Sequence, residues 1–392
     1  MSTHCPPTFA EVSTDLTFNG WAAAMNGTLD YLSGAATDGR LPWDVMRELG
    51  MWSEAMTDRK APSWHTPHTV CFEDPVARLR DFSTEGPQSS VVPTLVLPPQ
   101  AGHDSCIVDY SPEQSQMRTI LEAGLTRALS LDWVGATKET KNASIDDYLA
   151  TIDHALDHIG EPINLVGDCQ GGWLAAIYAA LNPSRVRSLT IAGAPIDFHD
   201  GEPIIHAALQ ALAPTGDLAF YRALVGSGGG VLKGEHLLAS FIMMQPDSEI
   251  SRQAELLINI HDAEYVGNYA HFEDWFKHTQ DIPGRFYLWI VEHLFANNEL
   301  LKGELMIAGE RVDLGRIDCP VNLIAGAIDH ITPAAQVFAL AGAVSTPPDQ
   351  IRQTLTTGGH LGLFMGHEAL REHWAPVMAK LARSQARELA AA

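Results

Sequence analysis

The stretch Ile163-Asn-Leu-Val-Gly167-Asp168-Cys169-Gln170-Gly171-Gly172-Trp173 has the pattern of a strand, a sharp turn and a helix. A cysteine occupies the turn, with a glycine two residues before it and another two residues after it. Glycine suits a crowded turn because it has no side chain to meet the neighbouring backbone. The pattern is that of a nucleophile elbow, with cysteine in place of the usual serine. A sulfur nucleophile favours acyl transfer through a thioester intermediate.

A single cysteine is often an inert buried residue, so the elbow alone decides little. Two segments further along the chain add to it. Residues 320–328 predict a buried strand that ends at Asp329, and residues 351–357 predict another strand, which leads to His360 in a glycine-rich loop. The order nucleophile, acid and histidine is that of the α/β-hydrolases. We therefore predict a catalytic triad of Cys169, Asp329 and His360.

The three side chains have separate expected tasks. His360 would accept the thiol proton of Cys169, since the thiolate is the reactive form. Asp329 would orient the imidazole and stabilise its positive charge. The N-terminus of the helix that begins near Gly171 also favours a negative charge on the sulfur.

The backbone N–H of Gln170 is the expected first donor to the oxyanion of the tetrahedral intermediate. The second donor is expected in the loop after the strand at residues 91–97. Two prolines open this loop and have no N–H, which leaves Gln100 or Ala101. An ordinary strand-to-helix turn without this role is the alternative. His103 in the same loop is an expected substrate contact, with a structural role as the alternative.

The wider chain alternates between strands and helices. Apolar runs predict strands at residues 91–97, 127–133, 163–167 and 188–192, with helical stretches between them. Such alternation predicts an α/β fold, namely a mostly parallel sheet with helices on both faces. We predict four segments: an N-terminal helical extension (1–67), the first part of an α/β-hydrolase core (68–200), a helical cap insertion (201–303) and the second part of the core (304–392).

Two aromatic stretches of the cap are candidates for lining an acyl tunnel. Trp275 lies in Phe272-Glu-Asp-Trp275-Phe276, and Trp289 ends Phe286-Tyr-Leu-Trp289. Aromatic residues at helical spacing more often pack in a core, so both interpretations stay open.

The composition limits which binding partners and which cellular compartment we expect. The formal net charge of −23 argues against nucleic acid or an anionic membrane as a partner. The five cysteines are scattered without a CxxC pair, which indicates a reducing compartment. The N-terminus has neither a basic nor an apolar stretch, and no membrane-spanning segment is evident. We expect a cytoplasmic protein.

One pair of histidines has a spacing that suits a metal. His154 and His158 lie four residues apart on a predicted helix. Aspartates flank them and no HExxH glutamate is present, so a solvated acidic helix face is the expectation. We expect neither a metal nor a cofactor.

Six segments carry a resemblance that covers about residues 91–381. They are Tyr110-Ser-Pro-Glu-Gln-Ser115, Asp146-Asp-Tyr-Leu149, Gly167-Asp-Cys-Gln-Gly-Gly172, Val312-Asp-Leu-Gly-Arg-Ile317, Asp329-His-Ile-Thr-Pro333 and Gly359-His-Leu-Gly362. With them the chain resembles the polyhydroxyalkanoate synthase and intracellular depolymerase superfamily. The resemblance implies catalytic roles for Cys169, Asp329 and His360.

The cap sequence differs from the synthase pattern, and this difference affects which function we expect. The tryptophan–asparagine motif of the synthase cap is not visible, and Phe272-Glu-Asp-Trp-Phe276 lies roughly in its place. We expect a carboxylic ester hydrolase of the depolymerase type, acting on short-chain 3-hydroxyacyl esters or polyester. One alternative is a synthase that takes acyl groups from a CoA thioester. Another is a non-catalytic binding protein at a storage granule. The expected partner is a small ester or polyester, and a homodimer is left open.

Overall fold

The computed structural model of the chain describes residues 9–201, 204–214 and 216–391. Its central feature is an eight-stranded sheet in the order β1-β2-β4-β3-β5-β6-β11-β12. The strands are β1 (Thr69–Glu73), β2 (Ala77–Asp81), β3 (Thr94–Leu97), β4 (Ala128–Trp133), β5 (Ile163–Asp168), β6 (Val186–Ala192), β11 (Val321–Gly326) and β12 (Ile351–Thr356). From β4 to β12 the neighbours pair in parallel, whereas β2 pairs antiparallel with both β1 and β4. The chain therefore has the predicted α/β-hydrolase fold.

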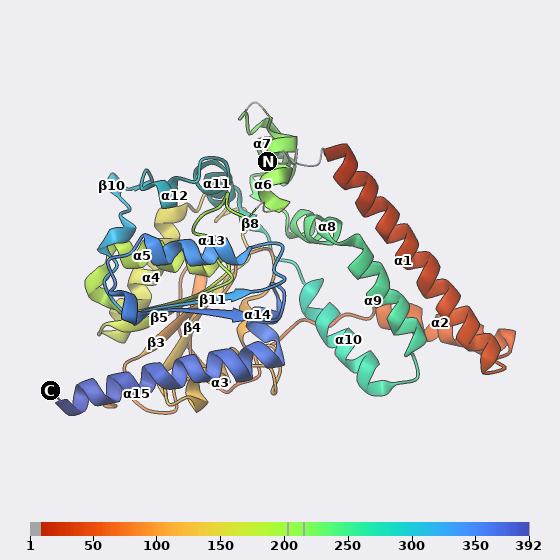
Figure 1. Ribbon diagram of the computed structural model, residues 1–392, viewed down its shortest axis with the longest axis horizontal. Coiled ribbons are helices and arrows are strands. Elements are labelled where there is room, and N and C mark those ends of the chain that lie inside the picture. Colours follow the sequence, from red (N-terminus) through yellow and green to blue (C-terminus); the bar gives the residue numbers. More distant parts are fainter. Residues whose placement is uncertain (1–8, 202–203, 215, 392) are drawn as a thin grey trace, which may run out of the picture. The chain divides into compact units, whose positions relative to one another are not determined.

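Helices cover both faces of this sheet. They include α3 (Gln116–Glu122), α4 (Ile145–Ile159), α5 (Gln170–Leu181), α13 (Ala334–Phe338), α14 (Gly362–Met365) and α15 (Ala375–Ala391). Figure 1 shows α3 and α15 below the sheet and α5 and α13 above it. All residues of β3, β4 and β5 are buried, as expected for strands covered on both faces.

The described residues divide into two compact units. The first unit comprises the described residues up to Pro62 together with Gly234–Thr279, and the second comprises those of Ser63–Lys233 and Gln280–Ala392. A short antiparallel pair, β7 (Val231–Leu232) with β8 (Ile282–Pro283), belongs to the second unit and marks where the chain leaves it and returns. The segment expected as a single cap, 201–303, is thus shared between the two units.

The named elements in the described part of the first unit are all helices. It contains α1 (Phe9–Thr37), α2 (Pro42–Thr57), α8 (Gly234–Met244), α9 (Pro246–Ile258) and α10 (Ala263–Phe276). The indole N–H of Trp52 donates to the carbonyl of Gln253 at 2.9 Å, which joins α2 to α9. A buried cluster of Leu256, Ile260 and Tyr269 forms part of its core.

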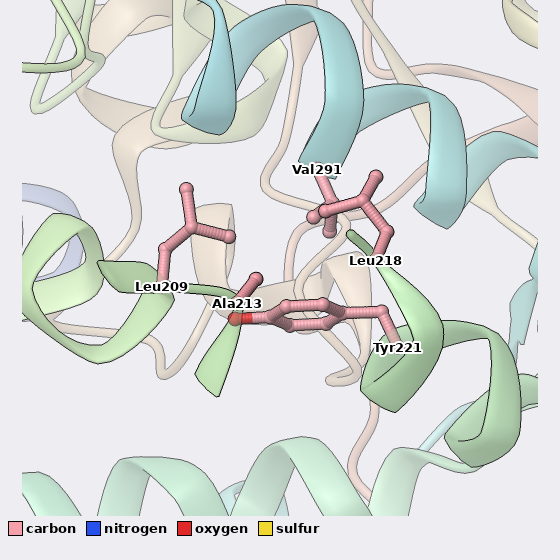
Figure 2. Close-up of a cluster of buried hydrophobic side chains, with 5 residues drawn as sticks. All are labelled: Leu209, Ala213, Leu218, Tyr221 and Val291. Atoms are coloured by element: carbon pink, nitrogen blue, oxygen red, sulfur yellow. The ribbon is translucent and has the colours of Figure 1, made fainter. Parts of the chain in front are cut away.

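The rest of the insertion belongs to the second unit. It contains α6 (Ile204–Leu212), α7 (Ala219–Ser227), α11 (Gly284–Trp289), a π-helical turn (Ile290–Ala296) and α12 (Glu299–Lys302). A hairpin of β9 (Met306–Ile307) and β10 (Glu310–Arg311) follows directly after the segment expected as the cap. Figure 2 shows Leu209, Ala213, Leu218 and Tyr221 together with Val291 of the π-helical turn in one buried cluster. A ring stack between Tyr148 and Phe286, with centroids 3.9 Å apart, joins α11 to α4.

Candidate active site

Cys169 lies at the sharp turn between β5 and α5. Its backbone has φ 48° and ψ −114°, a conformation that an L-residue rarely adopts and that stores strain. The turn is held on both sides: the Cys169 N–H donates to Ala192 O at 2.8 Å, and its carbonyl accepts from Gly172 N–H at 2.9 Å. Such strain at a fixed elbow is typical of functional turns.

The glycines around Cys169 allow the strand and the helix to approach closely. A Cβ atom at Gly167 would collide with the carbonyl oxygen of Gly171, and one at Gly171 would collide with that of Leu97 on β3. The G-x-C-x-G spacing is therefore needed by the packing of three backbone segments.

Asp329 lies in the loop that follows β11 and is 5% exposed. Its Oδ1 accepts the backbone N–H groups of Ile331 at 3.0 Å and Thr332 at 2.9 Å. Its Oδ2 accepts from Nδ1 of His360 at 2.7 Å. Both oxygens are thus engaged, and the carboxylate is fixed in orientation toward the imidazole.

His360 lies in the loop after β12, between Asp329 and Cys169. The residue is 8% exposed, and its ring packs edge-on against Phe364, with centroids 5.4 Å apart. Cys169 acts electrostatically on the ring. Because Nδ1 is bonded to Asp329, Nε2 is the nitrogen left for the sulfur. The structure brings together the three side chains that the sequence predicted as a triad.

The electrostatics of this cluster favour a charged imidazole. Burial by itself lowers the pKa of His360, but the interaction with Cys169 and the charge and hydrogen bond of Asp329 raise that pKa to about 10. A positive imidazole next to sulfur stabilises a thiolate. The arrangement can therefore hold a nucleophilic sulfur and a proton donor side by side.

The two segments expected to stabilise an oxyanion lie around one narrow gap that is too small to hold a water molecule. Gln100 from the loop after β3 and Gln170 from the start of α5 both border it, together with Trp133, Gly171, Leu174 and Phe286. Ala101 and His103 lie in the same loop as Gln100, and His103 is 7% exposed. The roles of these four residues stay predictions.

The two tryptophans expected at the substrate lie in different units. Trp289 is half-buried on α11, and its ring lies 6.2 Å from that of Trp173 on α5 and 5.3 Å from that of His293. Trp275 belongs to the first unit, where it is 3% exposed and packs near Phe272 and Phe276. Trp289 is thus connected to the elbow helix through one ring, whereas Trp275 lies in a helical core.

Sequence reasoning assigned no role to Asp168, which lies between Gly167 and Cys169. Its side chain is fully buried and accepts a hydrogen bond from Gln116 on α3 at 3.3 Å. The sequence did contain one signal for such a residue. Asp168 is a charged residue inside the elbow, and the other residues of its strand are apolar or small apart from Asn164.

The two histidines of α4 contact other side chains. Nδ1 of His154 hydrogen-bonds to Asp74 at 2.8 Å, and the ring of His158 lies 6.1 Å from that of Phe72. Within the described ranges, no group of three or more metal-ligating side chains is found. No helix in those ranges is both long and apolar enough to cross a bilayer.

A cysteine elbow beside a buried imidazole–carboxylate pair, on this sheet, places the chain in the α/β-hydrolase fold class. More particularly, residues 75–389 match the family described as "Protein of unknown function (DUF3141)", and the chain belongs to that family.

The chain is similar to curated proteins over most of its length. It is 27% identical to the poly(3-hydroxyalkanoate) polymerase subunit PhaC of Haloferax mediterranei, over 86% of this chain and 69% of the relative. It is 28% identical to the subunit of the same name from Allochromatium vinosum, over 84% of this chain and 92% of the relative. Among solved structures, a carboxylesterase of Nitrososphaera gargenis has a TM-score of 0.48 and 16% identity, covering 82% of this chain and 100% of that one.

Proposed function

We propose that the protein is a thiol-dependent acyl-transfer enzyme that carries 3-hydroxyacyl groups on Cys169. The observation that carries this proposal is the buried imidazole of His360, bonded to Asp329 and facing a sulfur on a strained elbow. The similarity to poly(3-hydroxyalkanoate) polymerase subunits over most of the chain supports the same acyl chemistry.

The first half of the reaction loads the enzyme. Nε2 of His360 takes the proton of the Cys169 thiol, and the thiolate attacks the carbonyl carbon of a 3-hydroxyacyl thioester or ester. The N–H of Gln170 and that of Gln100 or Ala101 would stabilise the oxyanion. When the donor's own C–S or C–O bond breaks, its leaving group takes the proton from His360. An acyl-Cys169 thioester remains.

The second half transfers the acyl group to an acceptor oxygen. His360 takes the acceptor's proton, the oxygen attacks the thioester carbonyl, and the sulfur of Cys169 leaves and regains the proton. A chain-end hydroxyl as acceptor lengthens a polyester, whereas water releases a free acid.

Between these acceptors we favour the hydroxyl, because the relatives compared above are polymerase subunits. Ester hydrolysis, which the sequence favoured, is the second candidate. It is supported by the cap sequence Phe272-Glu-Asp-Trp-Phe276, which stands roughly where the synthase motif would be.

Product analysis with 3-hydroxybutyryl-CoA tests the proposal and separates the two acceptors. Free CoA with insoluble polymer supports polymerisation, and free CoA with 3-hydroxybutyrate supports hydrolysis. The Cys169→Ala variant should release neither product. Cys71→Ala, which removes another half-buried free thiol, is the matched control and should keep full turnover. Turnover by a folded Cys169→Ala variant would contradict the proposal.

A further inference from the structure

Asp168 places a carboxyl group directly before the proposed nucleophile and completely out of water. Its side chain and that of Gln116 on α3 both have no exposed surface. The amide Nε2 of Gln116 donates to Oδ1 of Asp168 at 3.3 Å. A buried carboxylate that accepts one long hydrogen bond from a neutral donor destabilises the fold, because its charge is poorly compensated.

Two oxygens in this pair have no hydrogen-bond partner among the described residues. They are Oδ2 of Asp168 and Oε1 of Gln116, and both are buried. If Asp168 is ionised, both atoms are acceptors and neither can satisfy the other. One proton on Oδ2 changes this, because the acid O–H can donate to Oε1 while the amide N–H donates to Oδ1. A neutral acid and an amide can pair through two such hydrogen bonds, which would leave neither oxygen unsatisfied.

The surroundings of Asp168 agree with a neutral acid. The neighbouring strand β6 contributes Ala192 opposite it, and α3 contributes the neutral Gln116. The titratable groups near it are His360, whose charge acts on it, and Cys169, next in the chain. Burial raises the pKa of Asp168 to about 8, against the opposing effects of Gln116 and His360.

We propose that Asp168 is a positioning residue that works as a neutral acid paired with Gln116, and that this pair keeps a second negative charge away from the sulfur of Cys169. The proposal rests on acyl transfer at Cys169. When Asp168 loses its proton, a carboxylate lies one residue from the thiolate and from the developing oxyanion. Both are anionic, so the repulsion in a site of low dielectric slows the reaction. Ionisation of Asp168 then sets the alkaline limit of turnover.

Asp168→Asn tests this limit because its amide can form the same two hydrogen bonds with Gln116. Wild-type turnover should fall as the pH rises past about 8. The Asn variant should keep most of the neutral-pH rate and hold it toward pH 10, where His360 loses its proton. Asp132→Asn is the matched control, since Asp132 is also buried at the end of a strand but is ion-paired with Arg80. It should leave the alkaline limit unchanged. An Asn variant with the wild-type limit would overturn the proposal.

A measurement without turnover separates this proposal from the proposed function. With its pKa raised from 3.8 to about 8, folded Asp168 keeps a proton that the unfolded chain has released. Wild-type stability should therefore fall as the pH rises from 3.8 to about 8, relative to Asp168→Asn. The melting-temperature advantage of the Asn variant should grow across this range, and the wild type should show an infrared band of a protonated carboxylic acid that the variant lacks. A constant difference without that band would overturn the neutral pair. Turnover by Cys169→Ala would instead overturn the acyl-transfer function and leave the stability result standing.

Discussion

Nδ1 of His360 lies 2.7 Å from Oδ2 of Asp329, and the two side chains are 7% and 0% exposed. The second oxygen of Asp329 is held by the N–H groups of Ile331 and Thr332. The carboxylate thus cannot rotate away without losing backbone hydrogen bonds, and its bond to Nδ1 leaves Nε2 as the free ring nitrogen of His360. In the proposed mechanism this chain of contacts supplies the proton acceptor for the sulfur, and the predictions below test its parts.

Replacing the carboxylate of Asp329 should lower the catalytic rate strongly while it affects the stability of the fold less. We expect Asp329→Asn to lower kcat by about 10⁴-fold, because an amide at this position can favour the wrong imidazole tautomer. The comparison is with Asp74→Asn, which removes the carboxylate partner of the exposed His154 on α4 and should leave kcat unchanged. Steady-state kinetics with 3-hydroxybutyryl-CoA would measure both, and equal losses in the two variants would count against the role of Asp329.

The charge of His360 should appear in the pH dependence of stability. Its pKa is raised from 6.5 to about 10, so the stability that it contributes is complete below pH 6.5 and is lost as the pH rises to about 10. The difference in free energy of unfolding between wild type and His360→Gln should therefore shrink over this range. Chemical denaturation at several pH values measures it.

His206 provides the control for that experiment. Burial and the nearby charge of His199 lower its pKa, so its contribution is lost as the pH falls and not as it rises. His206→Gln should show the opposite trend. A difference for His360→Gln that grows with pH would mean that the imidazole is not paired with anionic groups.

The elbow glycines should tolerate no side chain. Gly171→Ala forces a Cβ against the backbone carbonyl of Leu97, and we expect a loss of about 3 kcal/mol in the free energy of unfolding. Gly226→Ala on α7 in the same unit meets no atom within 4 Å and should be neutral or stabilising by up to about 1 kcal/mol. If both variants have wild-type stability, the close packing described for the elbow is incorrect.

The two tryptophans should respond differently to truncation. Trp275→Ala empties a buried position of the first unit and should cost about 3–5 kcal/mol of stability. Trp289→Ala removes a half-buried ring next to Trp173, and we expect a smaller loss of stability with a raised KM. Unchanged KM for Trp289→Ala would remove this residue from the substrate site.

Local sequence signals predicted the parts of the fold that local chemistry determines. Serine favours helix starts, and Ser144 indeed precedes α4, where its N–H and hydroxyl both donate to Asp147, at 2.7 and 2.9 Å. The Ser111-Pro112 pair predicts a helix start that is wrong. The helix starts after Ser115, whose hydroxyl accepts from Arg118 N–H and also donates to Asp109. Asp109 is fully buried and binds Thr66 from a distant segment, a contact that sequence spacing does not reveal.

The same distinction applies to the site. The elbow and the order of Cys169, Asp329 and His360 are local patterns at strand ends, and the sheet order brings them to one edge. The pairing of Asp168 with Gln116 depends on α3 packing beside β5. The grouping of residues 234–279 with the N-terminal helices likewise depends on tertiary contacts, such as that of Trp52 with Gln253. Neither the Asp168–Gln116 pair nor this grouping of segments produces a periodic pattern in the sequence.

The most direct test of the central claim is mass spectrometry of the protein after rapid mixing with 3-hydroxybutyryl-CoA and acid quenching. The account predicts one 3-hydroxybutyryl group on the peptide that contains Cys169, absent from Cys169→Ala and accumulating more slowly in His360→Gln. An acyl group on another residue, or turnover without any adduct on Cys169, would contradict it.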